Sequence, residues 1–150
     1  MRAVIQRVSQ ASLTIDEQVY SSINQGLLVL LGVHQNDTEE DVDWLAPKIA
    51  QMRIFSDQEG KMNLSALDIG ASVMVVSQFT LHASTRKGNR PSFIEAAKPD
   101  LAIPLYEAFV KAMENYFPDR TATGSFGADM KINFTNDGPV TIIIDSKQKE

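Results

Sequence analysis

Val73-Met74-Val75-Val76-Ser77-Gln78-Phe79-Thr80-Leu81 is the stretch of sequence from which the fold can be worked out. It opens with an apolar run rich in β-branched residues, which predicts a strand buried on both faces. The run then becomes polar without a Gly or Pro to mark a turn, so strand alternation places Ser77, Phe79 and Leu81 on one face. Gln78 and Thr80 then share the other face. Because an unpaired buried polar group costs about 1–3 kcal/mol, these polar groups either bond to neighbouring backbone or meet a ligand.

This strand is one of about eight that the sequence predicts. The most apolar run in the chain, Leu27–Val33, is a candidate central strand. Asn136-Asp137-Gly138-Pro139 is expected to turn the chain into a last buried strand. The remaining strands, that last one included, are expected at Met1–Val8, Ala11–Ile15, Val19–Ile23, Arg53–Phe55, Phe126–Phe134 and Val140–Ile144.

Two main helices are expected between these strands. One begins after the capping residues Asn36–Thr38 and contains Pro47, which is expected to kink or split it. The other runs from Asp100 to about Phe117 and keeps apolar residues at helical spacing. Together the elements predict one α/β domain over residues 1–150, with a mixed sheet and two flanking helices.

The composition indicates an ordinary globular protein, with 43% hydrophobic and 22% charged residues. The chain has no cysteine, which excludes disulfides, thiolate metal sites and a cysteine nucleophile. A net charge of −5 argues against broad, nonspecific binding of nucleic acid but leaves room for a local basic patch. We find no membrane-spanning run and no secretion signal, so we expect a cytoplasmic protein.

The usual catalytic constellations are missing. The two histidines, His34 and His82, lack the spacing of a metal site and are interpreted as structural or surface residues. There is no Gly-x-Ser-x-Gly elbow and no dinucleotide or phosphate loop, so no cofactor and no metal are expected. If the chain is an enzyme, it does not use an ordinary triad.

Two local features suggest ligand contact. The loop that contains Arg86, Lys87 and Arg90 fits contact with phosphate groups, and it is equally compatible with a solvated surface loop. Gly138-Pro139 reads locally as a turn between two strands. An X–Pro bond can, however, be cis, and a Gly beside it leaves a backbone carbonyl open to a ligand.

Taken together, the two motifs resemble a known family. Ser77-Gln78-Phe79-Thr80-Leu81 and Asn136-Asp137-Gly138-Pro139-Val140-Thr141 are similar to the two signature motifs of the D-aminoacyl-tRNA deacylases. The resemblance covers the whole chain, because further segments also fit the family: Met1–Val8, Lys87–Phe93, Thr123-Gly124, Phe126–Ala128 and Met130.

The resemblance implies a function, a fold and an assembly. The fold would be a barrel-like, largely antiparallel sheet with two helices. The chain would be a cytoplasmic homodimer that hydrolyses the ester between a D-amino acid and the 3′-terminal adenosine of tRNA, with glycyl-tRNA as a further substrate. It would bind neither membrane nor DNA. The Gly138-Pro139 bond would be cis and would reach into the partner's pocket, where its carbonyls hold the amino group and exclude an L side chain.

The resemblance also assigns roles to residues. The catalytic residues would be Gln78, Phe79 and Thr80. Substrate binding would involve Ser77, Gly138 and Pro139. Weaker contacts with tRNA would come from Arg86, Lys87 and Arg90. Family analogy further suggests that Arg7 and Met130 brace the Gly-Pro segment.

Two mechanisms are open for the strand motif. Thr80 could be a nucleophile, but the sequence shows no base to activate it. Alternatively, a backbone N–H near Phe79 or Thr80 stabilises the oxyanion with help from Gln78, while the ribose hydroxyl assists a water molecule. We favour the second. Two other functions are considered: a non-catalytic module that binds RNA ends or nucleotides, and a dimeric structural protein.

Overall fold

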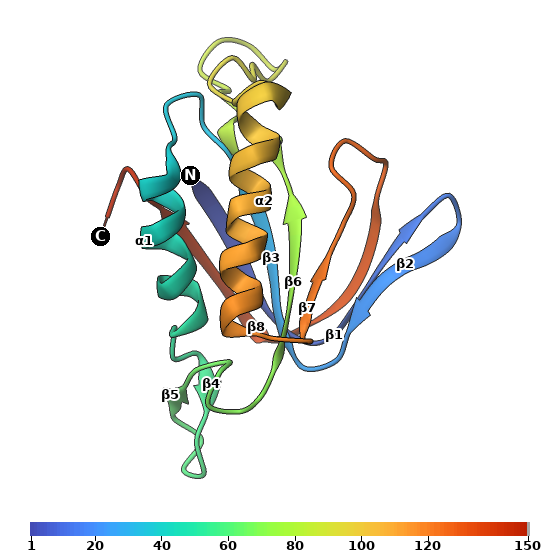
Figure 1. Ribbon diagram of the computed structural model, residues 1–150, viewed down its shortest axis with the longest axis vertical. Helices are drawn as coiled ribbons and strands as arrows, with labels where there is room; N and C mark the ends of the chain where they lie inside the picture. Colours follow the sequence, from blue (N-terminus) through green and yellow to red (C-terminus); the bar gives the residue numbers. More distant parts are fainter. Residues whose placement is uncertain (150) are drawn as a thin grey trace.

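The computed structural model describes residues 1–149 as a sheet with two helices on one side (Figure 1). The strands are β1 (Arg2–Ile15), β2 (Gln18–Ile23), β3 (Gly26–Gly32), β4 (Phe55–Ser56), β5 (Met62–Leu64), β6 (Ser72–Ser77), β7 (Thr121–Thr123) and β8 (Lys131–Asp145). The helices are α1 (Glu39–Ala50) and α2 (Pro99–Tyr116), and a 3₁₀ turn, η1 (Phe79–His82), follows β6. None of the helices among residues 1–149 has the length and apolar character that a membrane span requires.

The main sheet is organised around the long strand β1. Along one edge β1 pairs with β3 through its first half and with β2 through its second half, both antiparallel. Along its other edge it pairs antiparallel with β8 over nearly its whole length. The sheet continues from β3 to β6 and from β6 to β7 in parallel pairs, which gives the predicted mixed sheet with a majority of antiparallel pairs.

Both faces of the central strands are buried. One face packs against α1 and α2, and the other lies under the chain that curls back through the start of β8 (Figure 1). Val73–Val76 are at most 1% exposed, as the apolar run predicts. The residues that fill the core on the helix side come from both layers and include Ala3, Ile5, Leu27, Val29, Val75, Leu45, Ile49, Phe109 and Met113.

The predicted strand Val73–Leu81 is too long. β6 ends at Ser77, and the next residues form the turn η1, so the expected alternation of side chains beyond Ser77 is wrong. The neighbouring strand explains the ending. β3 stops at Gly32, and the Gln78 N–H donates the last bond of this ladder to the Leu31 carbonyl at 2.7 Å.

Three other predictions also fail in detail. Asn136–Pro139 does not turn between two strands, because β8 is continuous. The irregularity is a bulge in β8, where residues 137–140 stand opposite Arg7 alone, followed by a smaller shift in β1 between Val8 and Gln10. The predicted strand at Phe126–Phe134 begins only at Lys131. Pro47 does not split α1, because it lies near the C-terminal end, where its own carbonyl still accepts the bond from the Gln51 N–H.

A buried network of charges joins the ends of β1 and β8 to the first turn of α1. The α-ammonium of Met1 donates to Asp37 at 2.6 Å and to the Ser146 hydroxyl at 2.7 Å. That hydroxyl donates to Asp41 at 2.6 Å, and Lys147 donates to the same carboxylate at 2.7 Å. Burial alone would raise the pKa of Asp41, but the hydrogen bonds outweigh it and lower the pKa from 3.8 to about 2.

The network predicts a loss of stability in acid. A carboxyl group with a pKa depressed by folding stabilises the protein above its unfolded pKa, and this contribution disappears as the pH falls through the folded value. For Asp41 the loss should reach about 2 kcal/mol between pH 4 and pH 2. Urea unfolding across this range should therefore give a shallower pH dependence for Asp41→Asn than for the wild type. Equal slopes would contradict the assignment.

Candidate functional site

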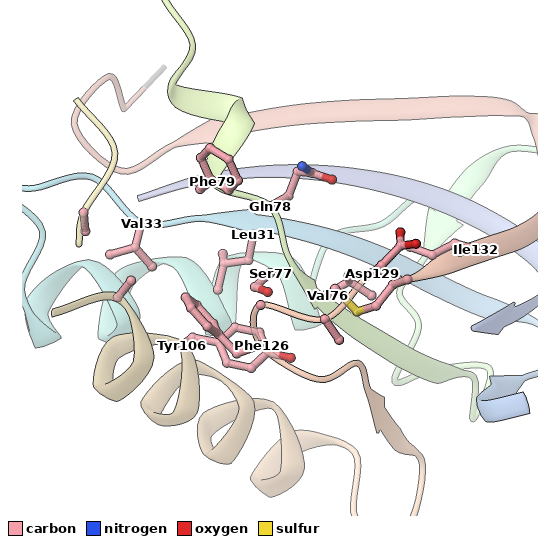
Figure 2. Close-up of a pocket in the computed structure, with 15 residues that line it drawn as sticks. Leu31, Val33, Val76, Ser77, Gln78, Phe79, Tyr106, Phe126, Asp129 and Ile132 are labelled. Atoms are coloured by element: carbon pink, nitrogen blue, oxygen red, sulfur yellow. The ribbon is translucent and has the colours of Figure 1, made fainter. Parts of the chain in front are cut away.

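A cavity of about 330 Å³ lies at the end of β6, where the sheet meets α2 (Figure 2). The strand motif enters it through Ser77, Gln78 and Phe79. The other walls come from β3, α2 and the segment before β8, with Leu31, Val33, Val76, Ala97, Ala102, Tyr106, Phe126, Gly127, Ala128, Asp129, Met130 and Ile132. Of the predicted catalytic residues, only Thr80 lies outside this lining.

The deep wall of the cavity is aromatic and apolar. The rings of Tyr106 and Phe126 lie 6.0 Å apart in a tilted pair, and Figure 2 shows them side by side below Ser77. The Tyr106 hydroxyl donates to the Val75 carbonyl at 2.9 Å, so it is already satisfied within the protein. Burial raises the pKa of Tyr106 to about 12, which keeps the phenol protonated at neutral pH. This wall therefore offers ring faces to a ligand.

Beside the cavity mouth, the turn η1 presents backbone donors. The amides of Phe79 and Thr80 donate no hydrogen bond to another backbone carbonyl in residues 1–149, as expected for the first residues of a helical turn. The Gln78 side-chain amide donates to the Thr80 hydroxyl oxygen at 2.6 Å. No histidine or carboxylate is hydrogen-bonded to Thr80 in the described chain, so no base is in place beside its hydroxyl.

The two histidines lie close together, and His82 is the last residue of the turn η1. His82 is only 6% exposed, and its Nε2 atom has no hydrogen-bond partner among residues 1–149. Burial lowers the pKa of His82, so the ring is neutral at pH 7. His34 lies 5.3 Å away, edge to face, and its Nε2 bonds to Glu95 at 3.0 Å. The described residues contain no cluster of His, Asp and Glu that could hold a metal ion.

Gly138-Pro139 is exposed on β8, and its peptide bond is cis. Arg7, from the facing strand, holds the segment in place: its Nε donates to the Asp137 carbonyl at 3.0 Å, and its Nη1 donates to the Ile54 carbonyl at 2.6 Å. The suggested bracing role of Arg7 thus has a geometric basis within one chain. Met130 instead lines the cavity, where its sulfur packs against Gly124.

Within one chain the two motifs lie far apart. Following the register across the sheet, Ser77 is level with Leu31, then with Ala3, and then with Ile144. Gly138 lies opposite Arg7, four residues further along β1 than Ala3, which is about 13 Å along the strand direction, and β8 is three strands across the sheet from β6, about 14 Å. Neither Gly138 nor Pro139 lines the cavity of its own chain. The structure therefore separates residues that the sequence motifs place in one site.

The basic loop is closed at its base by two backbone hydrogen bonds between Ser84 and Ser92, at 2.8 and 2.9 Å. Arg86, Lys87 and Arg90 are all exposed, and none forms an ion pair with another residue of the described chain. Their side chains are thus available to an anionic ligand.

Sequence comparison places the chain with known proteins. The family described as D-Tyr-tRNA(Tyr) deacylase matches residues 4–145. The chain belongs to this family. Relatives named D-aminoacyl-tRNA deacylase from Flavobacterium johnsoniae and Parabacteroides distasonis are 60% and 59% identical, and each comparison covers the full length of both chains. The prediction made from the two motifs is confirmed.

Solved structures agree with the fold. A structure titled c-Myc DNA Unwinding Element Binding Protein is 37% identical, has a TM-score of 0.92 and aligns over 97% of this chain and 98% of its own. A structure titled as an analysis of a probable eukaryotic D-amino acid tRNA deacylase is 17% identical, has a TM-score of 0.83 and aligns over 95% and 97%. The predicted deacylase-like α/β fold is confirmed.

Sequence reasoning missed two parts of the candidate site. Tyr106 and Ala102 lie on α2, just beside the apolar stripe that predicted this helix, and nothing in the spacing marks them as cavity residues. Gly32 was also missed, although a glycine that ends an apolar strand is a usable signal. A Cβ at Gly32 would lie 2.9 Å from the Gln78 carbonyl oxygen and 3.1 Å from side-chain atoms of Leu81 and His82.

We expect Gly32→Ala to move the turn η1. The added methyl group overpacks a tight contact, so the free energy of unfolding should fall by about 1–3 kcal/mol. The backbone amide resonances of Phe79 and Thr80 should shift with it. Gly60→Ala is the control for the resonances: its φ of +78° strains an L side chain and so also lowers stability, but no atom lies within 4 Å of its Cβ position, so the resonances of Phe79 and Thr80 should not shift. Unchanged resonances of Phe79 and Thr80 in Gly32→Ala would show that Gly32 does not set the position of the turn.

Proposed function

We propose that this chain hydrolyses the ester bond between a D-amino acid and the 3′-terminal adenosine of tRNA, in the cytoplasm, at a site shared between two copies of the chain. One copy supplies the cavity and the turn η1, and the other supplies Gly138-Pro139. Membership of the deacylase family supports the activity. The observation that supports the shared site is the separation between an exposed Gly138-Pro139 and the cavity of its own chain, about 13 Å along the strand direction and three strands across the sheet.

The exposed side of β8 supports pairing with a second copy. β8 pairs only with β1 in the described chain, so its other edge is open. Ile143 is 68% exposed on this strand, and Phe134 is 41% exposed. Exposed apolar residues along an open strand edge are typical of a surface that another chain covers. A symmetric dimer would complete both sites at once.

Gly138-Pro139 is suited to select the substrate by excluding L side chains. Gly138 has a φ of +130°, which L side chains rarely adopt, and a Cβ there would lie 3.0 Å from the guanidinium of Arg7. A rigid main chain braced by Arg7 can hold the substrate amino group through its carbonyls and leave no space for an L side chain. The same geometry admits glycine, which has no side chain, so glycyl-tRNA is a further substrate.

The cavity suits the terminal adenosine. Its volume of about 330 Å³ and the ring faces of Tyr106 and Phe126 fit a nucleobase, because exposed bases stack on aromatic side chains. With the base in this cavity, the ester would lie at the mouth, beside Ser77 and the turn η1.

Hydrolysis then proceeds without a protein nucleophile. A water molecule attacks the ester carbonyl carbon, and the oxyanion that forms is stabilised by the Phe79 and Thr80 amides, with Gln78 beside them. The bond to the ribose 3′-oxygen breaks, and the proton lost by the water passes through the neighbouring ribose 2′-hydroxyl to that oxygen. Thr80 serves to hold the Gln78 side chain, the partner it has in the structure.

Turnover distinguishes this function from a non-catalytic module that binds RNA ends. Purified protein should release D-tyrosine from D-Tyr-tRNA and leave L-Tyr-tRNA intact. Binding of both without release of amino acid would favour the module.

Thr80→Ala should remain an active enzyme. The variant loses the oxygen that accepts from Gln78 but keeps both backbone amides, so kcat for D-Tyr-tRNA should fall by about tenfold or less. Single-turnover kinetics measure the chemical step directly. A loss of several orders of magnitude with substrate binding retained would make Thr80 the nucleophile.

The shared site predicts complementation between two inactive variants. Ala102→Phe fills the cavity from the rigid helix α2, and Gly138→Ala disturbs the Gly-Pro segment. Each variant alone should lose hydrolysis of D-Tyr-tRNA. After the two are unfolded together and refolded, mixed dimers contain one intact site, and about a quarter of the wild-type activity should return.

The controls are the two variants refolded separately and then combined. Recovery no greater than the sum of the parents would contradict a shared site. Full protection of L-Tyr-tRNA by the Gly138→Ala variant, with D-Tyr-tRNA still hydrolysed, would contradict the chiral role of Gly138-Pro139.

A further inference from the structure

An exposed aromatic pair extends from the lining of the cavity onto the surface beside it. Phe79 is 54% exposed and Phe93 is 38% exposed, and their ring centroids lie 5.1 Å apart at an angle of 74°. Ile94, the next residue, is 76% exposed. Large apolar side chains gathered at the surface beside a binding site indicate that something covers them.

The position of this pair relates it to both the cavity and the basic loop. Phe79 lines the cavity, and in Figure 2 it stands at the start of the turn η1, above Ser77 and Leu31. Phe93 packs against Phe79 and is not part of the cavity lining. It directly follows Ser92, which closes the base of the basic loop by pairing with Ser84. A chain leaving the cavity over Phe79 would therefore reach Phe93 and then the loop.

We propose that Phe79 and Phe93 form a stacking platform for the unpaired nucleotides that precede the terminal adenosine of tRNA, while Arg86, Lys87 and Arg90 neutralise their phosphates. This inference rests on the proposed function, since it takes the terminal adenosine to occupy the cavity. It adds a second contact region, which recognises single-stranded RNA rather than the ester.

The chemistry of the patch favours RNA over a protein partner. Aromatic side chains next to a basic groove are the usual recognition surface for single strands, because every base has a face that can stack. In a chain of net charge −5, three unpaired cations within five positions form a distinctly local positive surface. Glu95 is the acidic residue nearest to the loop in sequence. Its carboxylate is hydrogen-bonded to the side chains of His34 and Gln35, and it forms no ion pair with the three cations of the loop.

Loss of the platform should weaken the binding of D-Tyr-tRNA and should not change the hydrolysis of a minimal substrate. Stacking contributes about 1–3 kcal/mol per base, so Phe93→Ala should raise KM for D-Tyr-tRNA about tenfold or more with little change in kcat. Hydrolysis of D-tyrosyl-adenosine, which lacks the preceding nucleotides, should be unchanged. Phe93→Trp should restore the wild-type KM for tRNA. Ile94→Ala is the matched control, because it removes a more exposed apolar side chain that has no ring, and its KM should not change.

A binding measurement tests the platform without relying on turnover. A tRNA with 2-aminopurine in place of the nucleotide before the terminal adenosine should lose fluorescence on binding wild-type protein and lose less on binding Phe93→Ala. If wild-type protein hydrolyses neither substrate, the proposed function fails, while this quenching still reports on the platform.

Three results would overturn the platform. One is an unchanged KM for tRNA and unchanged quenching in Phe93→Ala. Another is an equal loss of activity on tRNA and on D-tyrosyl-adenosine, which would mean that Phe93 acts only by positioning Phe79. The last is a Phe93→Ala protein that dissociates into monomers in sedimentation experiments but binds tRNA with unchanged affinity. This result would show that the aromatic pair contacts a second copy of the chain.

Discussion

The hydrogen bond from the Gln78 amide to the Leu31 carbonyl, 2.7 Å long, is the point on which the site depends. It is the last bond of the parallel pairing between β3 and β6, and beyond it the backbone of the motif leaves the sheet. Gly32 lets the turn η1 pack closely against the end of β3. Because β6 is buried on both faces up to this bond, the amides of Phe79 and Thr80 are held by the core although they lie at the surface.

A second constraint comes from β1, which is long enough to pair with three strands. Its register shifts around Val8 match the irregular stretch of β8 that contains Gly138-Pro139, so β8 remains one continuous strand. Arg7 lies at the same place and bonds to the Asp137 and Ile54 carbonyls. The Gly-Pro segment is therefore fixed by the longest pairing in the sheet. The proposed rejection of L side chains by its carbonyls would require this kind of rigidity.

The sequence predicted the elements well and their endings poorly. Hydrophobic runs such as Val73–Val76 report burial directly, and they located the central strands. Where a strand ends depends on its neighbour, and the sequence of β6 contains no information about Gly32. The bulge that contains Gly138-Pro139 was missed for a related reason, because it is defined by the pairing of β8 with β1. The family motifs identified the chemistry, whereas the cavity wall at Tyr106 depends on how α2 rotates against the sheet.

The electrostatics of the site explain why a search for catalytic side chains finds none. His82, the nearest histidine, is buried and neutral because its pKa is lowered, and Tyr106 stays protonated because its pKa is raised. No side chain hydrogen-bonded to Thr80 can take up a proton. Backbone amides do not titrate, so a site built from them works over a wide pH range. An aminoacyl ester is activated by its amino and ribose groups, and it needs correct placement and an oxyanion partner more than it needs a base.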